Sequence, residues 1–366
     1  MLHSIQLYSV LDTGISHRVG SVGQVKSMES RLYWTSSPND HSLPCEFITG
    51  QPCHSLYKPD PPRSLDDSDY DSPSSDYAPH SPASPHPGTQ RHEYHSLKFL
   101  GEGAYGEVHL VRNPFSRKYI PDDVLALKVI DLEHRREDSK QKFRNEVALQ
   151  NALTPLRHPN IVKCFGSNYE LELNQLQIFL EYVPGDDLRT IIRDSRHGCI
   201  DVRRARDYFR QVTRGVDFLH RFHVVHRDIK PENVIVNSNG LCKITDFGMA
   251  THLETTADNR EIPLDRMCGT SDFMSPQMFK KKYLGSKNDV WGLGIILVIM
   301  LTGRRPWRRA RKSDRRYYEW AYGRSLLYPL DRLTPATFEI VEYVLNVDEH
   351  TRPSCDEILE HSWLAL

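Results

Sequence analysis

The hydrophobic pattern of this 366-residue chain changes abruptly near residue 94, and the change limits where a folded core can form. Residues 58–95 are dense in Pro, Ser, Asp and His and hold almost no aliphatic side chains, so they cannot bury enough apolar surface to offset chain entropy. Residues 1–57 show no sustained apolar period of 2 or 3.6. Residues 1–93 also carry 6 Lys and Arg against 11 Asp and Glu. We predict a disordered, low-complexity, acidic leader over 1–93 and a folded domain over 94–364.

The segment after residue 94 begins with strand-like patterns and continues with helical ones. Residues 95–111 alternate apolar and polar side chains around glycines, which indicates a β-hairpin, and residues 124–130 and 176–183 are further strand-like runs. A helical pattern over residues 140–153 lies between those runs, and after Gly185 the pattern is mostly helical. We therefore predict an α+β fold with a small β-rich lobe, containing one main helix, and a larger, mostly helical lobe.

Cysteine usage and hydropathy indicate the cellular environment. The seven cysteines are odd in number, scattered and without Cys-x-x-Cys spacing, so a reducing compartment fits better than a disulfide framework or a zinc site. No run approaches the roughly 18 apolar residues of a membrane span, and the start lacks the basic and apolar regions of a signal peptide. We expect a protein of the nucleus or cytoplasm with no membrane association.

A glycine-rich turn opens the folded segment, with Gly101, Gly103 and Gly106 in the pattern G-x-G-x-x-G-x-V. Glycines let a hairpin backbone approach a polyphosphate and offer it N–H groups, although such turns are often only structural. Lys128 adds a cation on the next strand-like run, and Glu146 in the helical pattern could pair with it and fix it against nucleotide phosphates. In isolation, either charge would more often be merely solvated.

The stretch HVVHRDIKPENVIV, residues 223–236, places Asp228, Lys230 and Asn233 in one loop. Phosphoryl transfer needs this set: a carboxylate to accept the hydroxyl proton, a cation near the γ-phosphate, and an amide oxygen for a metal. Thirteen residues after Asn233, the sequence DFG supplies the carboxylate of Asp246 for a Mg²⁺ ion that bridges phosphates. We predict ATP and Mg²⁺ as cofactors, with Asn233 and Asp246 as metal ligands.

Together these motifs resemble a eukaryotic serine/threonine protein kinase domain over residues 95–364. The serine/threonine class, rather than the tyrosine class, is indicated by Lys230 in HRDIKPEN and by Thr270 in a Gly-Thr pair. The resemblance implies a bilobal kinase fold in which Thr270 bonds near Asp228 and Lys230. It also implies that Asp289 braces the loop from beneath. The catalytic set is then Asp228, Lys230, Asn233, Lys128, Glu146 and Thr270.

Four stretches resemble the checkpoint-kinase family of the DNA-damage response, in the CAMK-like group: LGEGAYGEVHLV, FLEYVPGDDL, DRMCGT and YYEWAYGRSLLYP. This resemblance implies a monomer with a role in cell-cycle or DNA-damage checkpoint signalling. It also implies an apolar nucleotide pocket with a few polar points, in which Leu180 is the gatekeeper. The implied nucleotide-binding set is Leu100, Gly101, Gly103, Gly106, Val108, Ala126, Lys128, Glu181, Val183, Glu232 and Ile235.

Gln277 departs from the family pattern, which has a glutamate at this position that pairs with a buried arginine, here Arg352. The amide keeps a carbonyl acceptor but lacks the charge, so we expect a loss of about 1 to 3 kcal/mol in stability and no loss of chemistry. The alternative is a pseudokinase scaffold that binds nucleotide or partners without turnover, and the intact Asp228 and Asp246 argue against it. A third reading makes the leader a docking tail.

Resemblance to basophilic kinases places Asp187 and Glu232 along the groove for the protein substrate. Each could form a charge-assisted pair with an arginine three residues before the phosphorylated serine or threonine. Because Asp187 is shorter than the usual glutamate, we expect a weakened arginine preference. Asp187 could instead contact the ribose or cap the next helix.

A basic run from Arg304 to Arg316 carries eight basic residues. It could be a solvated loop, a nuclear-import signal or a surface for an acidic partner. We expect no direct binding of nucleic acid, because the run lacks interleaved aromatic residues beyond Trp307.

Overall fold

The computed structural model describes residues 96–103, 106–115, 122–133, 143, 147–170, 173–323 and 325–365. All of them belong to one structural unit, His86–Leu366. The predicted disorder of the leader and the predicted role of Glu146 fall outside the described residues.

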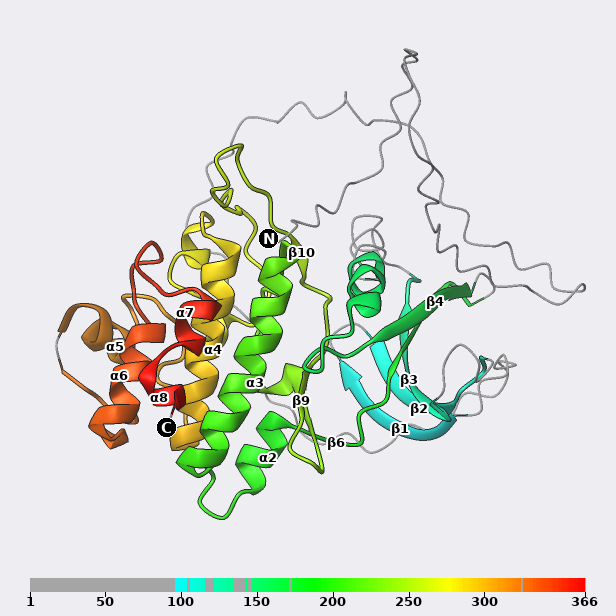
Figure 1. The fold of residues 1–366 in the computed structure, drawn as a ribbon, viewed down its shortest axis with the longest axis horizontal. Coiled ribbons are helices and arrows are strands. Elements are labelled where there is room, and N and C mark those ends of the chain that lie inside the picture. The colour runs from blue at the N-terminus through cyan, green and yellow to red at the C-terminus, as the bar shows by residue number, and fades with distance from the viewer. Residues whose placement is uncertain are drawn as a thin grey trace, which may run out of the picture. The chain divides into compact units, whose positions relative to one another are not determined.

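Five antiparallel strands form the sheet of the first lobe, in the order β1-β2-β3-β5-β4 (Figure 1). Their bounds are β1 Ser96–Gly103, β2 Gly106–Arg112, β3 Val124–Asp131, β4 Cys164–Glu170 and β5 Gln175–Glu181. The predicted hairpin over residues 95–111 is confirmed as β1 and β2, and the two further strand-like runs as β3 and β5. Residues 147–153, within the predicted helical segment, are helical. In the central strand β3, Lys128 lies opposite Val108 of β2 and Ile178 of β5.

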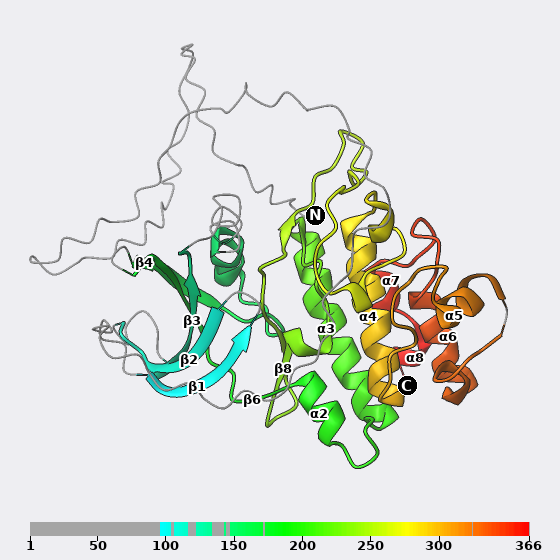
Figure 2. The same ribbon diagram turned by 180° about the vertical axis from the view of Figure 1, so that it is seen from behind.

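The second lobe is mainly helical, and its two longest helices, α3 and α4, pack against each other (Figures 1 and 2). The α-helices are α2 Leu188–Asp194, α3 Val202–Arg221, α4 Gly285–Thr302, α5 Arg315–Tyr318, α6 Pro335–Val344, α7 Cys355–Leu359 and α8 Ser362–Ala365. Short 3-10 or π turns are η1 Thr154–Leu156, η2 Pro231–Asn233, η3 Ser271–Phe273, η4 Met278–Lys280, η5 Glu319–Gly323 and η6 Leu330–Arg332. The predicted α+β fold with a β-rich lobe and a larger helical lobe is confirmed.

Two small sheets accompany these helices and carry the polar loops of the site. Strands β6 (Gly185–Asp187), β8 (Val234–Asn237) and β9 (Cys242–Ile244) form one sheet. Strands β7 (Val224–Val225) and β10 (Thr251–His252) form the other. The loop over residues 226–233 therefore starts at the end of β7 and finishes at the start of β8, so both of its ends are anchored by strand pairing.

Local sequence explains where the long helices begin and end. The Asp201 carboxylate accepts the backbone N–H groups of Arg203 and Arg204, both at 3.1 Å, and so caps the otherwise unsatisfied start of α3. Helix α4 ends at Gly303, whose φ of 71° favours glycine. A Cβ at this position would also lie 2.1 Å from the carbonyl oxygen of Gly198. The glycine therefore permits both the helix end and the close approach of the α2–α3 connection.

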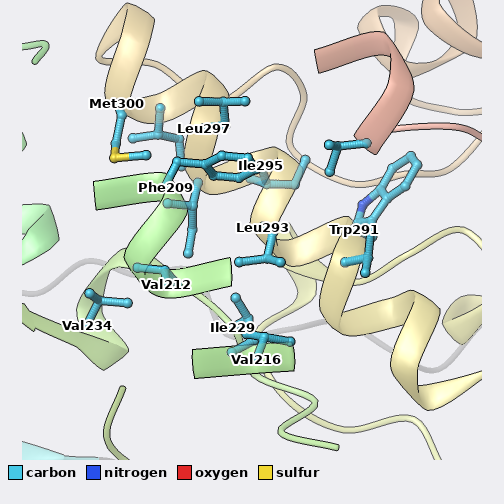
Figure 3. Packing of buried hydrophobic residues seen from close by; sticks show 14 of the residues in the cluster. Phe209, Val212, Val216, Ile229, Val234, Trp291, Leu293, Ile295, Leu297 and Met300 are labelled. Carbon is cyan, nitrogen blue, oxygen red and sulfur yellow. The ribbon is translucent and has the colours of Figure 1, made fainter. Parts of the chain in front are cut away.

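Helix α4 lies at the centre of the helical core, where it is buried on nearly all sides. Its side chains are therefore apolar around almost the whole helix. Figure 3 shows Phe209 of α3 beside Ile295 and Leu297 of α4, and Val216 of α3 beside Ile229. Ile229 belongs to loop 226–233, so the core holds that loop directly. Among the described helices, none is long and apolar enough to cross a membrane.

Truncation of Leu293, at the centre of α4, tests how far this core supports the fold. Leu293 is 0% exposed, so Leu293→Ala leaves a cavity and should lower the free energy of unfolding by about 2 to 5 kcal/mol. Leu326→Ala is the matched control, because Leu326 is 45% exposed. Urea unfolding of both variants measures the difference, and equal losses would contradict a core centred on α4.

Candidate active site

Four polar side chains meet in loop 226–233 and the segment that faces it. Asp228, which is 7% exposed, accepts the backbone N–H of Thr270 at 2.7 Å through Oδ1. Its Oδ2 lies 2.7 Å from Lys230 Nζ and 3.2 Å from Asn233 Nδ2. Lys230 Nζ also donates to Thr270 Oγ1 at 2.8 Å. The structure thus brings together four residues that the sequence placed in one set.

A buried carboxylate beneath the loop fixes its backbone. Asp289 of α4 is 0% exposed and accepts the N–H of His226 at 2.8 Å and that of Arg227 at 2.7 Å. Arg227 has a φ of 64°, an uncommon conformation for a residue with a side chain, and the surrounding bonds hold it there. His220 near the end of α3 adds a third contact, 3.0 Å from its Nε2 to Asp289. The position of Asp228 therefore depends on α3 and α4.

Asp246 connects the two lobes through an ion pair with the sheet. Lys128 Nζ on β3 lies 2.9 Å from Asp246 Oδ1, and the lysine is only 8% exposed. Burial by itself would raise the pKa of Asp246, but the charge and hydrogen bond of Lys128, with smaller effects from His226 and Lys230, outweigh it and lower the pKa. Asp246 is therefore a carboxylate at neutral pH and has a φ of 61°.

The donor set at Asn233 and Asp246 suits a small hard cation. Asn233 uses its Nδ2 as the donor to Asp228, which leaves the side-chain oxygen as an acceptor. The backbone bond from Thr245 N to Asn233 O, 3.0 Å, places the residue before Asp246 beside Asn233. No cluster of three His, Cys, Asp or Glu occurs in the described ranges. One amide oxygen and one carboxylate match Mg²⁺, which retains waters and takes substrate phosphates as ligands.

The apolar residues expected around a nucleotide gather in one cluster from five segments of the chain. Ala126, Leu180 and Val183 are buried there. Leu100, Val108 and Ile235 are half-buried and pack against them. Glu181, beside Leu180, is held by an ion pair of 3.1 Å with the buried Lys243. Sequence reasoning missed this pair, because Lys243 lies 62 residues away in the sequence.

The three glycines of the opening turn have different surroundings. Gly103 pairs with Gly106 across the hairpin of β1 and β2. A Cβ on Gly106 would lie 2.0 Å from the carbonyl oxygen of Val129, so glycine is required there by the approach of β3. Among the described residues, a Cβ on Gly101 would meet nothing within 4 Å. Packing therefore explains Gly106 but does not explain Gly101.

The two acids expected to pair with a substrate arginine differ in the contacts that their carboxylates already make. Asp187 is the N-cap of α2, and its two carboxylate oxygens accept the backbone N–H and the hydroxyl of Thr190, both at 2.9 Å. This is the capping alternative that the sequence left open. Glu232 is exposed on η2. Of the two, only Glu232 presents a carboxylate that is not already bonded to its own helix.

Gln277 contacts Arg352 as expected, and both belong to a network of buried carbonyl groups. Gln277 Oε1 accepts Arg352 Nη2 at 3.0 Å, while Gln277 Nε2 donates to Val347 O at 2.6 Å. The guanidinium, 1% exposed, also donates to the carbonyls of Asn346 and Lys287, both at 2.8 Å. Burial lowers the pKa of Arg352 to about 10, although Glu349 opposes the shift. The charge persists at neutral pH without a directly bonded carboxylate.

Comparisons with known proteins agree with this geometry. A family profile described as "Protein kinase domain" matches residues 94–364. "Serine/threonine-protein kinase chk-1" of Caenorhabditis elegans is 37% identical over 234 residues, which is 64% of this chain and 44% of that protein. The chk-1 protein of Caenorhabditis briggsae is 33% identical over 279 residues, 76% of this chain and 54% of that protein. "Serine/threonine-protein kinase grp" of Drosophila melanogaster is 32% identical over 266 residues, 72% and 49% respectively.

This chain spans about half the length of these curated relatives. The resemblance to checkpoint kinases that the sequence indicated is confirmed by these matches.

Replacement of Gln277 by glutamate tests the network around Arg352. Gln277→Glu supplies a negative charge, and Val347 O remains satisfied because Arg352 Nη2 lies 3.3 Å away. We expect the free energy of unfolding to rise by about 1 to 3 kcal/mol. Asn239→Asp, an exposed amide-to-acid change, should have almost no effect. Denaturant unfolding measures both differences. A Gln277→Glu protein that is less stable than the parent would show that the Arg352 charge is already fully compensated.

The contact between His220 and Asp289 should make stability depend on pH. Burial alone would lower the pKa of His220, but Cys355 and Asp289 outweigh it and raise the pKa above its ordinary value. The folded protein then binds the proton more tightly than the unfolded chain. The stabilisation from protonated His220 is complete below about pH 6.5, the pKa in the unfolded chain. It is lost as the pH rises through the higher pKa of the folded state.

The unfolding free energies of the parent and His220→Gln should therefore differ most at about pH 6, and this difference should shrink toward about pH 9. His252→Gln, at an exposed histidine, should show no such trend. A gap that stays constant or widens with pH would show that His220 is neutral in the folded protein.

Proposed function

The chain belongs to the protein kinase family, and on this premise we propose that it transfers the γ-phosphate of ATP to serine and threonine hydroxyls of proteins. One observation supports the proposal most. Asp228 is held by Thr270, Lys230 and Asn233 at hydrogen-bonding distance, and Lys128 is paired with Asp246. Phosphoryl transfer depends on positioning and electrostatic stabilisation, and these contacts supply both.

Each of these side chains has a proposed role. Asp228 orients the substrate hydroxyl and accepts its proton, and Thr270 holds that carboxylate in place. Lys230 adds positive charge where charge develops on the transferred phosphoryl group. Lys128 and Glu146 would hold the α- and β-phosphates, and Asn233 with Asp246 would hold Mg²⁺. When bound, Mg-ATP would supply the phosphoryl group, and the metal ion would offset negative charge on the phosphates.

The remaining nucleotide contacts are proposed along the apolar cluster and its edges. Ala126 and Ile235 would lie on the two faces of the adenine ring, while the backbones of Glu181 and Val183 would bond its edge. Further contacts are proposed for Leu100, Gly101, Gly103, Gly106, Val108 and Glu232. Leu100, Val108, Ala126 and Ile235 pack in one cluster, and Val108 lies opposite Lys128, which supports one continuous nucleotide site.

The pseudokinase scaffold remains the second candidate, and its one supporting feature is the altered segment that ends at Gln277. In the structure this residue bonds to Arg352 and Val347, and within the described residues none of its hydrogen bonds reaches loop 226–233. Asp228, Asn233 and Asp246 are all present. The altered segment therefore bears on stability, and we favour the active enzyme.

The biological setting is proposed from the relatives. We propose a role in cell-cycle or checkpoint signalling, because the chain is similar to the chk-1 and grp kinases. We also propose action as a monomer in the nucleus or cytoplasm, on protein substrates and without direct binding of nucleic acid. For selection of an upstream arginine, Glu232 is the favoured reader, because the carboxylate of Asp187 already caps α2.

Asp228→Asn tests the proposed chemistry. The variant cannot accept the hydroxyl proton, so kcat should fall at least about 100-fold, whereas ATP affinity should change little because Lys128 and Asp246 are intact. Asp331→Asn, at an exposed acid, is the matched control and should keep full activity. Phosphate transfer from labelled ATP to a peptide library gives the rates. Equal turnover by Asp228→Asn and the parent would overturn the assignment, and no turnover by the parent would favour the scaffold.

A further inference from the structure

Five arginines from three elements surround one cavity of about 420 Å³ in the helical lobe. Arg189 belongs to α2, Arg304, Arg305 and Arg308 follow the end of α4, and Arg316 lies on α5. All five are exposed to solvent. We call this cavity the arginine pocket. The sequence had identified the basic run from Arg304 to Arg316, but it gave no reason to expect Arg189 beside it.

The positive charge of the arginine pocket is only partly balanced. Among the described residues, the one carboxylate in an ion pair with these five guanidinium groups is Asp272, which contacts Arg305. Asp314 binds the backbone N–H groups of Arg308 at 2.8 Å and Arg316 at 3.0 Å. Partial burial of the Arg305 side chain, followed by repulsion from Arg189 and Arg308, lowers the pKa of Arg305, and Glu232 opposes the shift. The pocket therefore has excess positive charge.

A buried anchor keeps the arginine pocket in place. Pro306 and Trp307 lie between the arginines, and both are buried. The Trp307 ring centroid lies 5.5 Å from that of Trp291 on α4, so the segment is fixed to the core. On the opposite wall, the guanidinium of Arg316 lies 6.0 Å from the centre of the Tyr328 ring. A pocket held in this way binds a ligand with less loss of conformational entropy than a free loop.

The arginine pocket adjoins the proposed site of transfer. Asp272, the partner of Arg305, lies two residues after Thr270, which contacts both Asp228 and Lys230. Helix α2, which carries Arg189, packs against η2, the turn that contains Glu232. A substrate chain that presents its hydroxyl to Asp228 can therefore extend to the pocket.

We propose that the arginine pocket is a substrate subsite for a carboxylate or phosphate side chain, several residues from the phosphorylated serine or threonine. The proposal rests on the proposed kinase function and adds an anionic residue to its substrate class. Arginine is suited to this task because its planar donors form forked, charge-assisted bonds with carboxylate and phosphate groups. The same positive charge weakens the attraction of the nearby Glu232 for a substrate arginine.

A peptide panel tests the subsite. Each peptide has one acceptor serine, and a single position at a varied distance from it holds Glu, phosphoserine, Ala or Arg. For the parent, kcat/KM at the best position should be about tenfold higher with Glu or phosphoserine than with Ala. Comparison of Glu with phosphoserine shows which anion the pocket takes. No preference for either anion, or a preference for Arg at every position, would overturn the proposal.

Variants locate the effect within the molecule. Arg304→Gln, Arg308→Gln and Arg316→Gln together should reduce the anion preference to about twofold or less, with kcat/KM for the Ala peptide nearly unchanged. Arg316→Gln alone should reduce it in part, and Arg315→Gln, at the exposed neighbour outside the pocket, should not. Full retention of the preference in the triple variant, or an equal loss in Arg315→Gln, would assign the effect elsewhere.

Binding without ATP separates this proposal from the kinase proposal. A fluorescent phosphoserine peptide with Ala in place of the acceptor serine should bind the parent about tenfold more tightly than it binds the triple variant, by anisotropy near physiological salt. If the parent transfers phosphate to no peptide but this difference is found, the subsite stands and the kinase proposal fails. Equal binding overturns the subsite. Single-stranded DNA and the unlabelled peptide, at equal charge, are then compared as competitors of the fluorescent peptide. If the DNA competes more tightly, the pocket is a nucleic-acid surface and the proposal is overturned.

Discussion

The buried carboxylate of Asp289 holds the backbone on which the candidate active site depends. It accepts two N–H groups from loop 226–233, and hydrogen bonds to a charged group contribute about 1.5 to 3 kcal/mol each. The loop needs this support because Arg227 has a left-handed backbone conformation, which is unfavourable for a residue with a side chain. Asp289 itself sits on α4, whose apolar faces are buried on nearly all sides. The hydrophobic core therefore fixes the position of Asp228, because it fixes α4 and the Asp289 side chain that holds the loop.

The second constraint is the connection between the sheet and the helical lobe. The ion pair between Lys128 and Asp246 links β3 to the segment after β9, and it joins a buried lysine to a half-buried carboxylate. Each charge compensates the other, so neither is buried alone. The apolar cluster that includes Ala126 and Ile235 spans the same two regions. The proposed nucleotide site would draw on both of these regions.

Positive charge is treated in two different ways in the helical lobe. Arg352 is buried, and four acceptor oxygens surround its guanidinium, three from the backbone and one from Gln277. Hydrogen bonding thereby substitutes in part for the absent carboxylate. The five arginines of the arginine pocket are exposed, and in the described part of the chain Asp272 pairs with one of them. Buried charge is satisfied internally, whereas the arginine pocket keeps an excess of positive charge at the surface.

The sequence by itself determined the class of fold, the motif set and the family, because these depend on residue types at short spacing. Asp228, Lys230 and Asn233 lie within six residues, so one loop must hold them together. Periodicity also identified the hairpin of β1 and β2 and the long helices.

Contacts between residues distant in sequence were decided only by the tertiary structure. Arg189 joins Arg304 at one cavity, Asp187 caps its own helix, and Lys243 pairs with Glu181. Side-chain direction and the packing of segments far apart in sequence fix such contacts, and neither is encoded in the local pattern of residues.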